Sequence, residues 1–347
     1  MKIVLVGEAG EHEADLRTHL DGPYDIVTLP ASAAVSAAHD AVIEPDDVVV
    51  SLRWRRDPAP GPAMRLLHVP GAGLDAIDLA ALRPETTVAN VFEHETPIAE
   101  FVLARLLEWE IRAGALQASF DPGTWPRTYR HRVPHGEVAG RTLGLIGYGR
   151  IGRAIAVRAA AFGIRVTAVD DHATGDVTTD DVATVLPTSA LPTLLAGSDY
   201  VVVACPLTPE TTGMIDAAAL AAMPGHAVLV NISRAPIVDE AALYAALAEQ
   251  RIGGAILDVW YRYPTGADDD APPATRPFWE LPNAWCTPHS SAWTRQLPGR
   301  RYAVIADNVH RLASGRPLRN VVRAGTPVIT SNGPSSRRSS HDTHPDT

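Results

Sequence analysis

The sequence has little cysteine, a single lysine and no long apolar run, and each shortage excludes a class of protein. Cys205 and Cys286 are the two cysteines and lie far apart in sequence. They provide neither a disulfide framework nor a zinc motif, so we expect a reducing cytoplasm and no metal site. No run approaches the roughly 18 apolar residues of a membrane-spanning helix. Because Lys2 is the only lysine, a Schiff-base lysine and a P-loop phosphate clamp are excluded.

The balance of charge narrows the possible partners. The 347 residues include 30 basic and 40 acidic side chains, which gives a net charge of −10. This balance argues against a nucleic-acid or anionic-membrane partner. Apolar residues make up 46% of the chain, enough for a sizeable core. The length predicts two domains of roughly 150 residues each.

Short β-rich runs alternate with helical stretches, which predicts an α/β fold with parallel sheets covered on both faces. The predicted strands are IVLVG, VVVSLR and LLHVPGAG, then LGLI, VTAV, DYVVVACPL, AVLVNIS and GGAILDVW. We predict helices at 102–116 and about 297–314, with an irregular stretch at 117–139. Residues 324–347 are rich in Ser, Pro and Thr and predict a disordered tail.

The motif Gly147-Tyr148-Gly149-Arg150-Ile151-Gly152 follows the apolar strand LGLI and opens a helical stretch. In this context the three glycines predict a tight turn, a close approach to a pyrophosphate and close helix–strand packing. The next strand ends in Asp170. A carboxylate there accepts hydrogen bonds from ribose hydroxyls and repels a 2′-phosphate, so the sequence predicts NAD rather than NADP.

Three further segments carry polar residues at strand ends. The first is Asn231-Ile232-Ser233-Arg234, after VLV; the second is Asp258, inside AILDVW; the third is Thr287-Pro288-His289. An arginine can grip a carboxylate and polarise an adjacent carbonyl, and a histidine donates and accepts protons near neutral pH. Beside a nicotinamide, this pair suffices to interconvert a 2-keto acid and a 2-hydroxy acid. The plainer alternatives are a surface arginine and a capping or core histidine.

Over about residues 65–322, the sequence resembles the NAD-dependent D-isomer-specific 2-hydroxyacid dehydrogenases. The resemblance rests on LLHVPGAGLDAIDLAAL, PIAEFVLARLL, CPLTPETTGMID, NISRAPIVDEAALYAAL and LPNAWCTPHSSAWT. It implies two doubly wound Rossmann-like domains, with the coenzyme domain inserted into the substrate domain and the active site in the cleft. The implied substrate domain is 1–98 plus 293–323, and the implied coenzyme domain is 99–292. A homodimer through the coenzyme domain is also expected.

The resemblance also implies roles for individual residues. Arg234 matches the substrate-binding arginine and His289 the acid/base histidine. Gly71-Ala72-Gly73 match the loop whose backbone N–H groups hold the substrate carboxylate, which implicates Ala72 and Gly73. The implied cofactor-binding residues are Gly147, Gly149, Arg150, Ile151, Gly152, Asp170, Cys205, Pro206, Thr211, Ile232, Ser233 and Asp258.

One position departs from the family pattern. The family has a catalytic glutamate just before a proline a few residues past Asp258, and the matching residue here is Tyr263. A glutamate would raise the pKa of the histidine, whereas a neutral tyrosine orients the ring with little electrostatic support. We therefore include Tyr263 among the catalytic residues. A carboxylate from the loop residues Asp268, Asp269 or Asp270 is the alternative.

Three residues are candidates for substrate selection. Arg53 opens the run Arg-Trp-Arg-Arg, which either binds a second anionic group or forms a solvated loop. His94, between two acidic residues, is either a substrate contact or a surface cap. Trp293, four residues after His289, is a candidate for the pocket wall.

Together these observations predict an NAD(H)-dependent oxidoreductase that interconverts a small 2-keto acid and a D-2-hydroxy acid. One alternative is hydride abstraction without proton transfer, as in formate dehydrogenases, which also lack the glutamate. Another is a non-catalytic NAD-binding scaffold. Phosphite oxidation is disfavoured, because that branch places a lysine where Ala72 stands.

Overall fold

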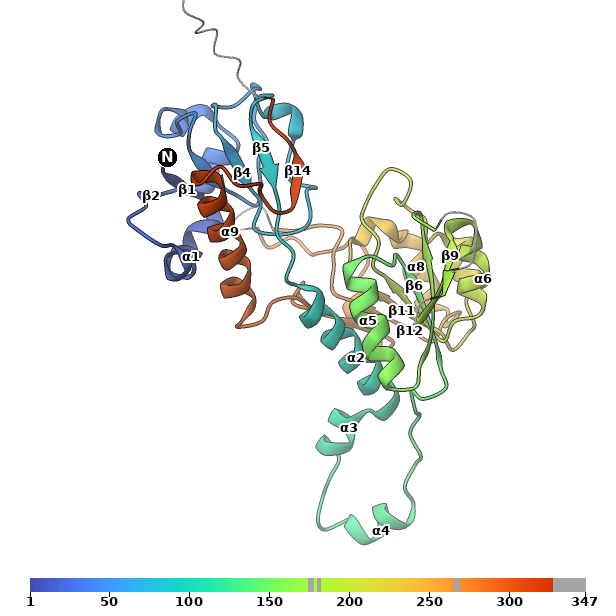
Figure 1. Ribbon diagram of the computed structural model, residues 1–347. Helices are drawn as coiled ribbons and strands as arrows, with labels where there is room; N and C mark the ends of the chain where they lie inside the picture. Colours follow the sequence, from blue (N-terminus) through green and yellow to red (C-terminus); the bar gives the residue numbers. More distant parts are fainter. Residues whose placement is uncertain (174–177, 180–181, 265–268, 327–347) are drawn as a thin grey trace, which may run out of the picture. The chain divides into compact units, whose positions relative to one another are not determined.

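The computed structural model describes residues 1–173, 178–179, 182–264 and 269–326 (Figure 1). The chain forms two compact units. The terminal unit comprises 1–91 and 304–347, and the central unit comprises 92–303. The assignment of these units as substrate and coenzyme domains stays a prediction, as do the boundaries 98/99 and 292/293. Most of the expected tail lies outside the described residues.

The terminal unit is built on a six-stranded sheet in the order β14-β5-β4-β3-β1-β2. The strands are β1 (Ile3–Val6), β2 (Ile26–Leu29), β3 (Val48–Val50), β4 (Leu66–His68), β5 (Thr87–Ala89) and β14 (Val321–Arg323). All neighbouring pairs are parallel except β14 with β5. The helix α1 (Glu13–His19) belongs to this unit, as does the end of α9 (Leu297–Ala313).

The central unit holds an eight-stranded sheet in the order β13-β12-β11-β10-β6-β7-β9-β8. Its strands are β6 (Thr142–Ile146), β7 (Arg165–Asp170), β8 (Thr178–Thr179), β9 (Ala183–Pro187), β10 (Tyr200–Val203), β11 (Val228–Asn231), β12 (Gly254–Leu257) and β13 (Ala284–Cys286). Only β8 pairs antiparallel among these described strands. The strand order reverses between β6 and β10, which is where doubly wound sheets bind ligands.

Helices cover both faces of the central sheet, as the continuous apolar strands require. The covering helices are α2 (Glu95–Ile111), α5 (Arg150–Ala161), α6 (Leu191–Ala196), α7 (Ala217–Ala222) and α8 (Glu240–Ala248). Two short helices, α3 (Ala113–Ala118) and α4 (Trp125–Arg130), lie between α2 and β6 in the chain. Tyr200 and Val202 share a buried cluster with residues of α2 and α5. Val201 and Val203 share the opposite cluster with residues of α6, α7 and α8. Alternate side chains of β10 therefore pack against the helix layers on opposite faces of the sheet.

The structure confirms the fold class and the predicted long helix near 297–314, and it corrects the prediction at 102–116. The helix α2 begins at Glu95 and ends at Ile111, and α3 follows separately. Arg112 interrupts them with a left-handed backbone, φ 57°. Its guanidinium lies over the rings of Trp109 and Trp285, at 4.5 and 4.8 Å from their centroids. The contact of this cation with two aromatic rings offsets the cost of this conformation.

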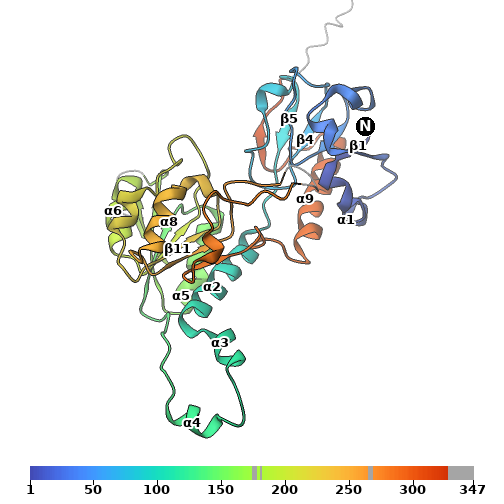
Figure 2. The same cartoon turned by 180° about the vertical axis from the view of Figure 1, so that it is seen from behind.

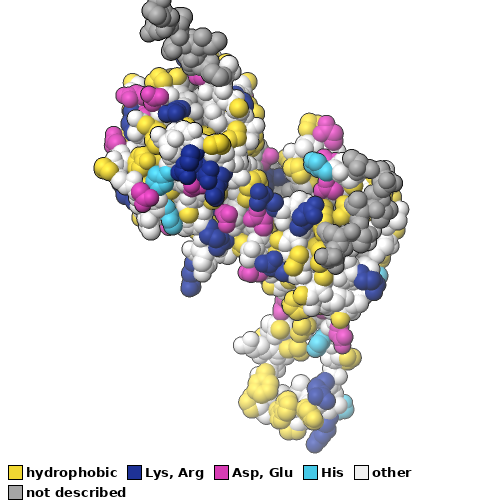
Figure 3. Space-filling model, in the orientation of Figure 1, with side chains coloured by type: hydrophobic (Ala, Val, Ile, Leu, Met, Phe, Trp, Pro, Cys, Tyr) yellow, Lys and Arg dark blue, Asp and Glu magenta, His cyan; other side chains and the backbone are white. Residues whose placement is uncertain are grey.

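Helices α3 and α4 lie on an excursion that projects from the rest of the central unit (Figures 1 and 2). Phe120, Trp125 and Tyr129 form a chain of aromatic contacts here. Yellow side chains gather at its tip (Figure 3). The large apolar side chains exposed along this arm are Leu116, Phe120, Trp125, Tyr129 and Val133. Among the described residues, no helix combines the length and apolarity needed to cross a membrane.

Candidate active site

The loop after β6 needs glycine for steric reasons. Gly147 has φ +101°, and a Cβ there would lie 2.7 Å from the backbone nitrogen of Cys205. At Gly152 a Cβ would strike the carbonyl oxygen of Gly147. These two glycines therefore allow β6, β10 and α5 to approach one another, as the spacing predicts.

Gly149 differs, because a Cβ there would meet no protein atom within 4 Å. Open space above a glycine at the start of a helix is what a pyrophosphate requires. Gly149 is also the N-cap of α5, with no side-chain capping bond, so the first N–H groups of α5, at Arg150 and Ile151, are available to an anion. The loop therefore fits the diphosphate of a dinucleotide.

Asp170 ends β7 beside this loop. Its carboxylate accepts hydrogen bonds from the Tyr148 N–H at 2.6 Å and the His172 N–H at 3.0 Å. Burial alone would raise the pKa of Asp170, but these hydrogen bonds outweigh it and lower the pKa. The group is thus a fixed anion at neutral pH. Asp171 and His172 lie close enough to form a ligand cluster with it, although exposed acidic groups often cluster without a metal.

The segment after β10 is a turn that Thr211 closes. The Thr211 hydroxyl donates to the carbonyl of Pro206 at 2.8 Å and accepts from the Thr208 N–H at 2.8 Å. Cys205 is free, and burial raises the pKa of its thiol to about 11. The thiol is therefore neutral, and the turn presents backbone rather than a reactive group.

The Asn231–Arg234 turn after β11 is fixed by its own first residue. The Asn231 side chain accepts from the Ser233 N–H at 3.1 Å and donates to the Arg234 carbonyl at 3.0 Å. The Ser233 hydroxyl donates to the Cys205 carbonyl, and Ile232 is buried. The Arg234 guanidinium donates to the Ser233 carbonyl at 2.8 Å. The turn thus links the ends of β10 and β11 and fixes the backbone from which the Arg234 side chain extends.

Asp258, fully buried after β12, organises the segment that carries His289. Its carboxylate accepts from the Thr287 hydroxyl at 2.6 Å and from the N–H groups of Ser290 and Ser291 at 2.8 and 2.9 Å. The His289 backbone lies in the left-handed region, φ 55°. Such strain persists only where neighbours over-determine it, and Asp258 supplies that restraint. The family resemblance did not imply this anchoring role.

Tyr263 contacts the His289 ring at its Nδ1 atom. The Tyr263 hydroxyl lies 2.8 Å from Nδ1 of His289 and accepts the Trp260 N–H at 3.2 Å. Burial lowers the pKa of His289, Arg234 lowers it further, and Asp258 opposes both. His289 and Tyr263 also line a cavity of about 520 Å³, together with Trp260, Arg262, Trp279 and Cys286.

Of the acidic-loop alternatives, Asp269 is engaged elsewhere. Its carboxylate pairs with Arg262 at 2.5 Å and accepts the Ala271 N–H at 3.2 Å. Asp270 is exposed, and Asp268 lies outside the described residues. Within the described part of the chain, Nδ1 of His289 therefore hydrogen-bonds with the Tyr263 hydroxyl rather than with a carboxylate.

His94 is not the surface cap that one reading of the sequence allowed. It occupies the N-cap position of α2 but makes no capping bond, and it is 8% exposed. Its Nδ1 is buried without a hydrogen-bond partner. Burial lowers the pKa of His94, and the charges of Arg301 and Arg234 lower it further. Arg301 is a candidate that sequence reasoning missed, since only the folded chain brings the start of α9 to the start of α2.

The start of α2 also reaches the start of α5. Arg150 lies 3.7 Å from the Glu95 carboxylate and stacks over Phe92 at 4.3 Å. Arg300 donates to the Glu93 carbonyl at 3.0 Å. Trp293 is 64% exposed, on the segment after His289. The central unit therefore brings together Arg234, His289, Tyr263, Asp258 and His94, as the charge couplings and hydrogen bonds among them show.

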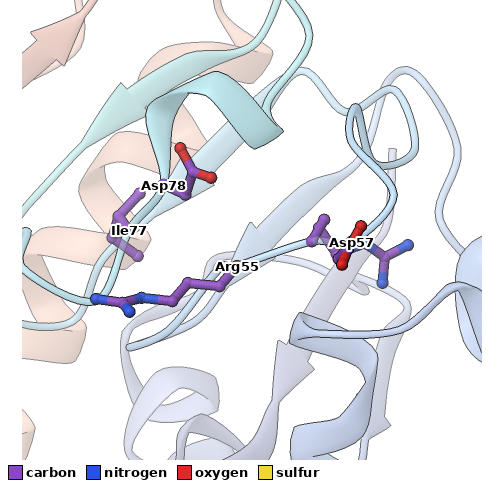
Figure 4. Close-up of a pocket in the computed structure, with 5 residues that line it drawn as sticks. Arg55, Asp57, Ile77 and Asp78 are labelled. Carbon is purple, nitrogen blue, oxygen red and sulfur yellow. The ribbon is translucent and has the colours of Figure 1, made fainter.

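The other candidates lie in the terminal unit. Arg56 is buried and donates to the carbonyls of Ala33 and Ser36 and to Asp40, so its charge is satisfied internally. Arg55 lines a cavity of about 350 Å³ with Arg56, Asp57, Ile77 and Asp78. Figure 4 shows Ile77 between Asp78 and the guanidinium of Arg55. The carboxylates of Asp57 and Asp78 offset the charges of the two arginines that line this cavity, so it offers no excess positive charge to an anion.

The loop after β4 carries Ala72 and Gly73. The Asn90 side chain donates to the Ala72 carbonyl at 2.9 Å, and the Val91 N–H donates to the Gly71 carbonyl at 3.2 Å. Asn90 thus fixes the loop in a way that the motif did not reveal. Arg53 is exposed at the end of the segment after β3. The roles expected for Ala72, Gly73 and Arg53 stay predictions.

Comparison with known proteins agrees with this architecture. Residues 103–291 match the family model described as D-isomer specific 2-hydroxyacid dehydrogenase, NAD binding domain. The chain is 33% identical over 268 residues to a glyoxylate reductase of Korarchaeum cryptofilum, covering 75% of this chain and 76% of the relative. It is 32% identical over 273 residues to D-3-phosphoglycerate dehydrogenase of Mycobacterium tuberculosis, covering 78% of this chain. The match spans about half of that relative's length, 49%.

Among solved structures, a D-isomer specific 2-hydroxyacid dehydrogenase from Xanthobacter autotrophicus Py2, in complex with NADPH and MES, superposes with a TM-score of 0.67. It is 27% identical, and the match covers 92% of this chain and 97% of that one. The doubly wound central unit, the glycine loop and these matches lead to one conclusion. The chain belongs to the D-isomer specific 2-hydroxyacid dehydrogenase family.

Proposed function

We propose that this protein is an NAD(H)-dependent oxidoreductase that interconverts a 2-oxo acid and a D-2-hydroxy acid. The observation that carries the proposal is the pairing of Arg234 with a rigidly held His289 in the unit that contains the glycine loop. Asp258 anchors the histidine segment through three hydrogen bonds. Such restraint is typical of a group that must meet a reacting atom in one orientation.

Arg234, His289 and the glycine loop have separate roles in the proposed reaction. Arg234 grips the substrate carboxylate and polarises the adjacent carbonyl. His289 supplies a proton to the carbonyl oxygen during reduction and takes it back during oxidation. Backbone N–H groups of the glycine loop hold the diphosphate. When bound, the nicotinamide supplies or accepts the hydride. The residues proposed to border the cofactor are Gly147, Gly149, Arg150, Ile151, Gly152, Asp170, Cys205, Pro206, Thr211, Ile232, Ser233 and Asp258.

We also propose that NAD is preferred over NADP. The support is Asp170, an anion whose pKa is lowered by two backbone N–H groups, beside the glycine loop. A carboxylate there accepts hydrogen bonds from the ribose hydroxyls and repels a 2′-phosphate. The family model is described as NAD binding, whereas the relative from Xanthobacter autotrophicus was solved with NADPH, so the preference of this chain needs a direct test. The ratio of NADH to NADPH dissociation constants tests this preference.

His94 and Arg301 support an anionic substrate. Burial and then the charges of Arg301 and Arg234 lower the pKa of His94, and an anion bound beside the ring would raise that pKa and favour its protonation. We propose His94 as a substrate contact, with Arg301 adding positive charge and Trp293 standing on the segment beside His289. Substitution of Arg301 by glutamine should raise KM more than it lowers kcat.

A homodimer is proposed through the α3–α4 arm. The support is its row of exposed aromatic and aliphatic side chains, since exposed apolar patches mark association sites. Light scattering after size-exclusion chromatography measures the mass. Phe120→Ser with Trp125→Ser should yield monomer, whereas unchanged mass would argue against this interface.

The activity is tested by NADH oxidation with glyoxylate, hydroxypyruvate, 2-oxoglutarate and phosphonopyruvate from pH 5 to 9. Arg234→Ala and His289→Ala should each abolish turnover while NADH still binds. Absence of turnover in the parent protein with every acid, with intact NADH binding, would contradict the proposal. Formate would then be tested as a donor that releases no substrate proton.

A further inference from the structure

The group behind His289 is a phenol rather than a carboxylate, and this determines which ring nitrogen carries the proton. An ionised carboxylate only accepts hydrogen bonds, so it requires a proton on Nδ1. A neutral phenol has one proton to donate and lone pairs that accept. The two partners therefore favour opposite tautomers of a neutral histidine.

The surroundings of Tyr263 favour donation toward the ring. The phenol oxygen already accepts the Trp260 N–H at 3.2 Å. Nδ1 of His289 lies at 2.8 Å, within easy reach of the hydroxyl proton. If the phenol donates, Nδ1 is the acceptor and Nε2 carries the ring proton. A neutral histidine then already presents an N–H group on the side away from Tyr263.

We propose, on the basis of the function proposed above, that Tyr263 holds His289 in the neutral tautomer protonated on Nε2 and supplies the replacement proton to Nδ1 during reduction. Tyr263 is thus a positioning residue that acts through His289 and also relays a proton.

The relay balances without a charged histidine. As the substrate carbonyl is reduced, the Nε2–H bond breaks and an O–H bond forms on the substrate oxygen. At the same time the Tyr263 O–H bond breaks and an Nδ1–H bond forms, which leaves a phenolate. After the product departs, Nε2 takes a proton from water and Nδ1 returns its proton to the phenolate. Each turnover therefore consumes one solvent proton.

The electrostatics of the site suit this relay. The charged groups that act on the ring are Arg234, which disfavours the imidazolium, and Asp258, which favours it. Burial lowers the pKa of His289 below its ordinary value of 6.5, so the ring is neutral at pH 7. In the same cavity Arg262 is paired with Asp269, and burial raises the pKa of Cys286 to about 11. Neither group therefore supplies a competing proton or a free charge.

Tyr263 is correspondingly a stable proton reservoir. Burial and the charge of Asp258 raise the pKa of its hydroxyl, while the Trp260 N–H and Arg234 work in the opposite direction and stabilise the phenolate that forms transiently. The side chain is 39% exposed, so solvent reaches it. A substrate alkoxide is more basic than a phenolate, so the proton moves toward the substrate.

The first test measures the tautomer directly. Protein labelled with ¹⁵N in the histidine rings is studied by long-range ¹H–¹⁵N correlation at pH 8, without cofactor or substrate. The His289 signals are assigned by their loss in His289→Gln. The proposal requires a protonated Nε2 and an unprotonated Nδ1. Tyr263→Glu should reverse this pattern. A wild-type ring protonated on Nδ1 overturns the proposal, and this measurement does not depend on any substitution at Tyr263.

The second test measures kcat/KM for reduction between pH 6 and 10. The parent protein should keep a flat profile, because its proton comes from a phenol rather than an imidazolium. Tyr263→Phe should lose about tenfold per pH unit above the lowered pKa of His289, since only the imidazolium can then donate. Tyr263→Glu should shift this fall to higher pH.

Tyr261→Phe is the matched control. It removes a hydroxyl that donates to the Val238 carbonyl at 2.9 Å, two residues away and outside the relay, so its profile should follow the parent. Equal profiles for Tyr263→Phe and Tyr261→Phe would overturn the relay. If the parent reduces no 2-oxo acid but keeps the Nε2 proton, the proposed function and the relay both fail while the tautomer stands.

Discussion

The glycine loop and the histidine segment occupy the same edge of one sheet, but they are built in opposite ways. At the glycine loop the structure depends on missing side chains. A Cβ would strike Cys205 at Gly147, while at Gly149 it would occupy the space left for a ligand. At the histidine segment the structure depends on side chains, since Asp258, Trp260 and Tyr263 fix His289. The comparison indicates that cofactor binding and proton transfer can be altered separately.

The largest expected effect is at Arg234. Arg234→Ala removes the guanidinium that grips and polarises the substrate, so kcat/KM should fall about a thousandfold. Arg234→Lys should recover little, because an ammonium cannot make two parallel hydrogen bonds. The NADH dissociation constant, measured by fluorescence quenching, should change little. A matching loss of NADH affinity would show that the two regions are not separable.

A smaller loss is expected at Asp258. Asp258→Asn places an amide N–H against backbone N–H donors, so the histidine segment loosens and kcat should fall about 10- to 100-fold. Steady-state kinetics measure the loss, and thermal unfolding checks that the fold survives. Unchanged kcat in a folded variant would contradict the anchoring role.

The two glycines give a matched pair within the loop. Gly147→Ala faces a positive φ and a close backbone contact, so it should cost at least about 2 kcal/mol of unfolding free energy. Gly149→Ala meets no neighbour and should cost less than about 1 kcal/mol. Denaturant unfolding separates them.

Gly149→Ala, the milder of the two substitutions for stability, should nevertheless impair cofactor binding. Gly149→Ala should weaken NADH about tenfold despite its intact fold, because the methyl group fills the space reserved for the diphosphate. Isothermal titration gives the dissociation constant. If Gly149→Ala binds NADH as the parent does, the diphosphate does not approach this residue.

The last expected effect, similar in size to that of Gly149→Ala on NADH binding, is at Asp170. Asp170→Asn keeps an acceptor for the Tyr148 N–H but removes the charge, so the preference for NADH over NADPH should shrink about tenfold. The ratio of the two dissociation constants is the readout, with Asp171→Asn as the neighbouring control. An unchanged ratio would place the discrimination elsewhere.

The comparison also explains what the sequence predicts well. The fold class, the glycine loop and its strand and helix follow from local spacing, because they depend on steric rules along the chain. The break at Arg112 was missed, since it rests on Trp285, far along the sequence. The short strands β2, β5 and β14 were also missed, because short strands stabilised by their neighbours carry little periodicity of their own.

The candidate site shows the same limit. The positions of Arg234 and His289 follow from strand ends and family motifs. The anchoring by Asp258, the burial of His94 and the approach of Arg301 depend on contacts between distant segments, so no local pattern encodes them. Tyr263 lies between these cases, because the motif marks its position but only the structure gives its 2.8 Å contact with Nδ1.

The most direct measurement combines NADH binding with single-turnover reduction of the best 2-oxo acid by His289→Gln. The account predicts an NADH dissociation constant within about threefold of the parent and a hydride-transfer rate reduced at least about a thousandfold. Parallel loss of NADH binding would contradict the separation of the two regions. A rate close to the parent's would contradict the assignment of His289 as the proton donor.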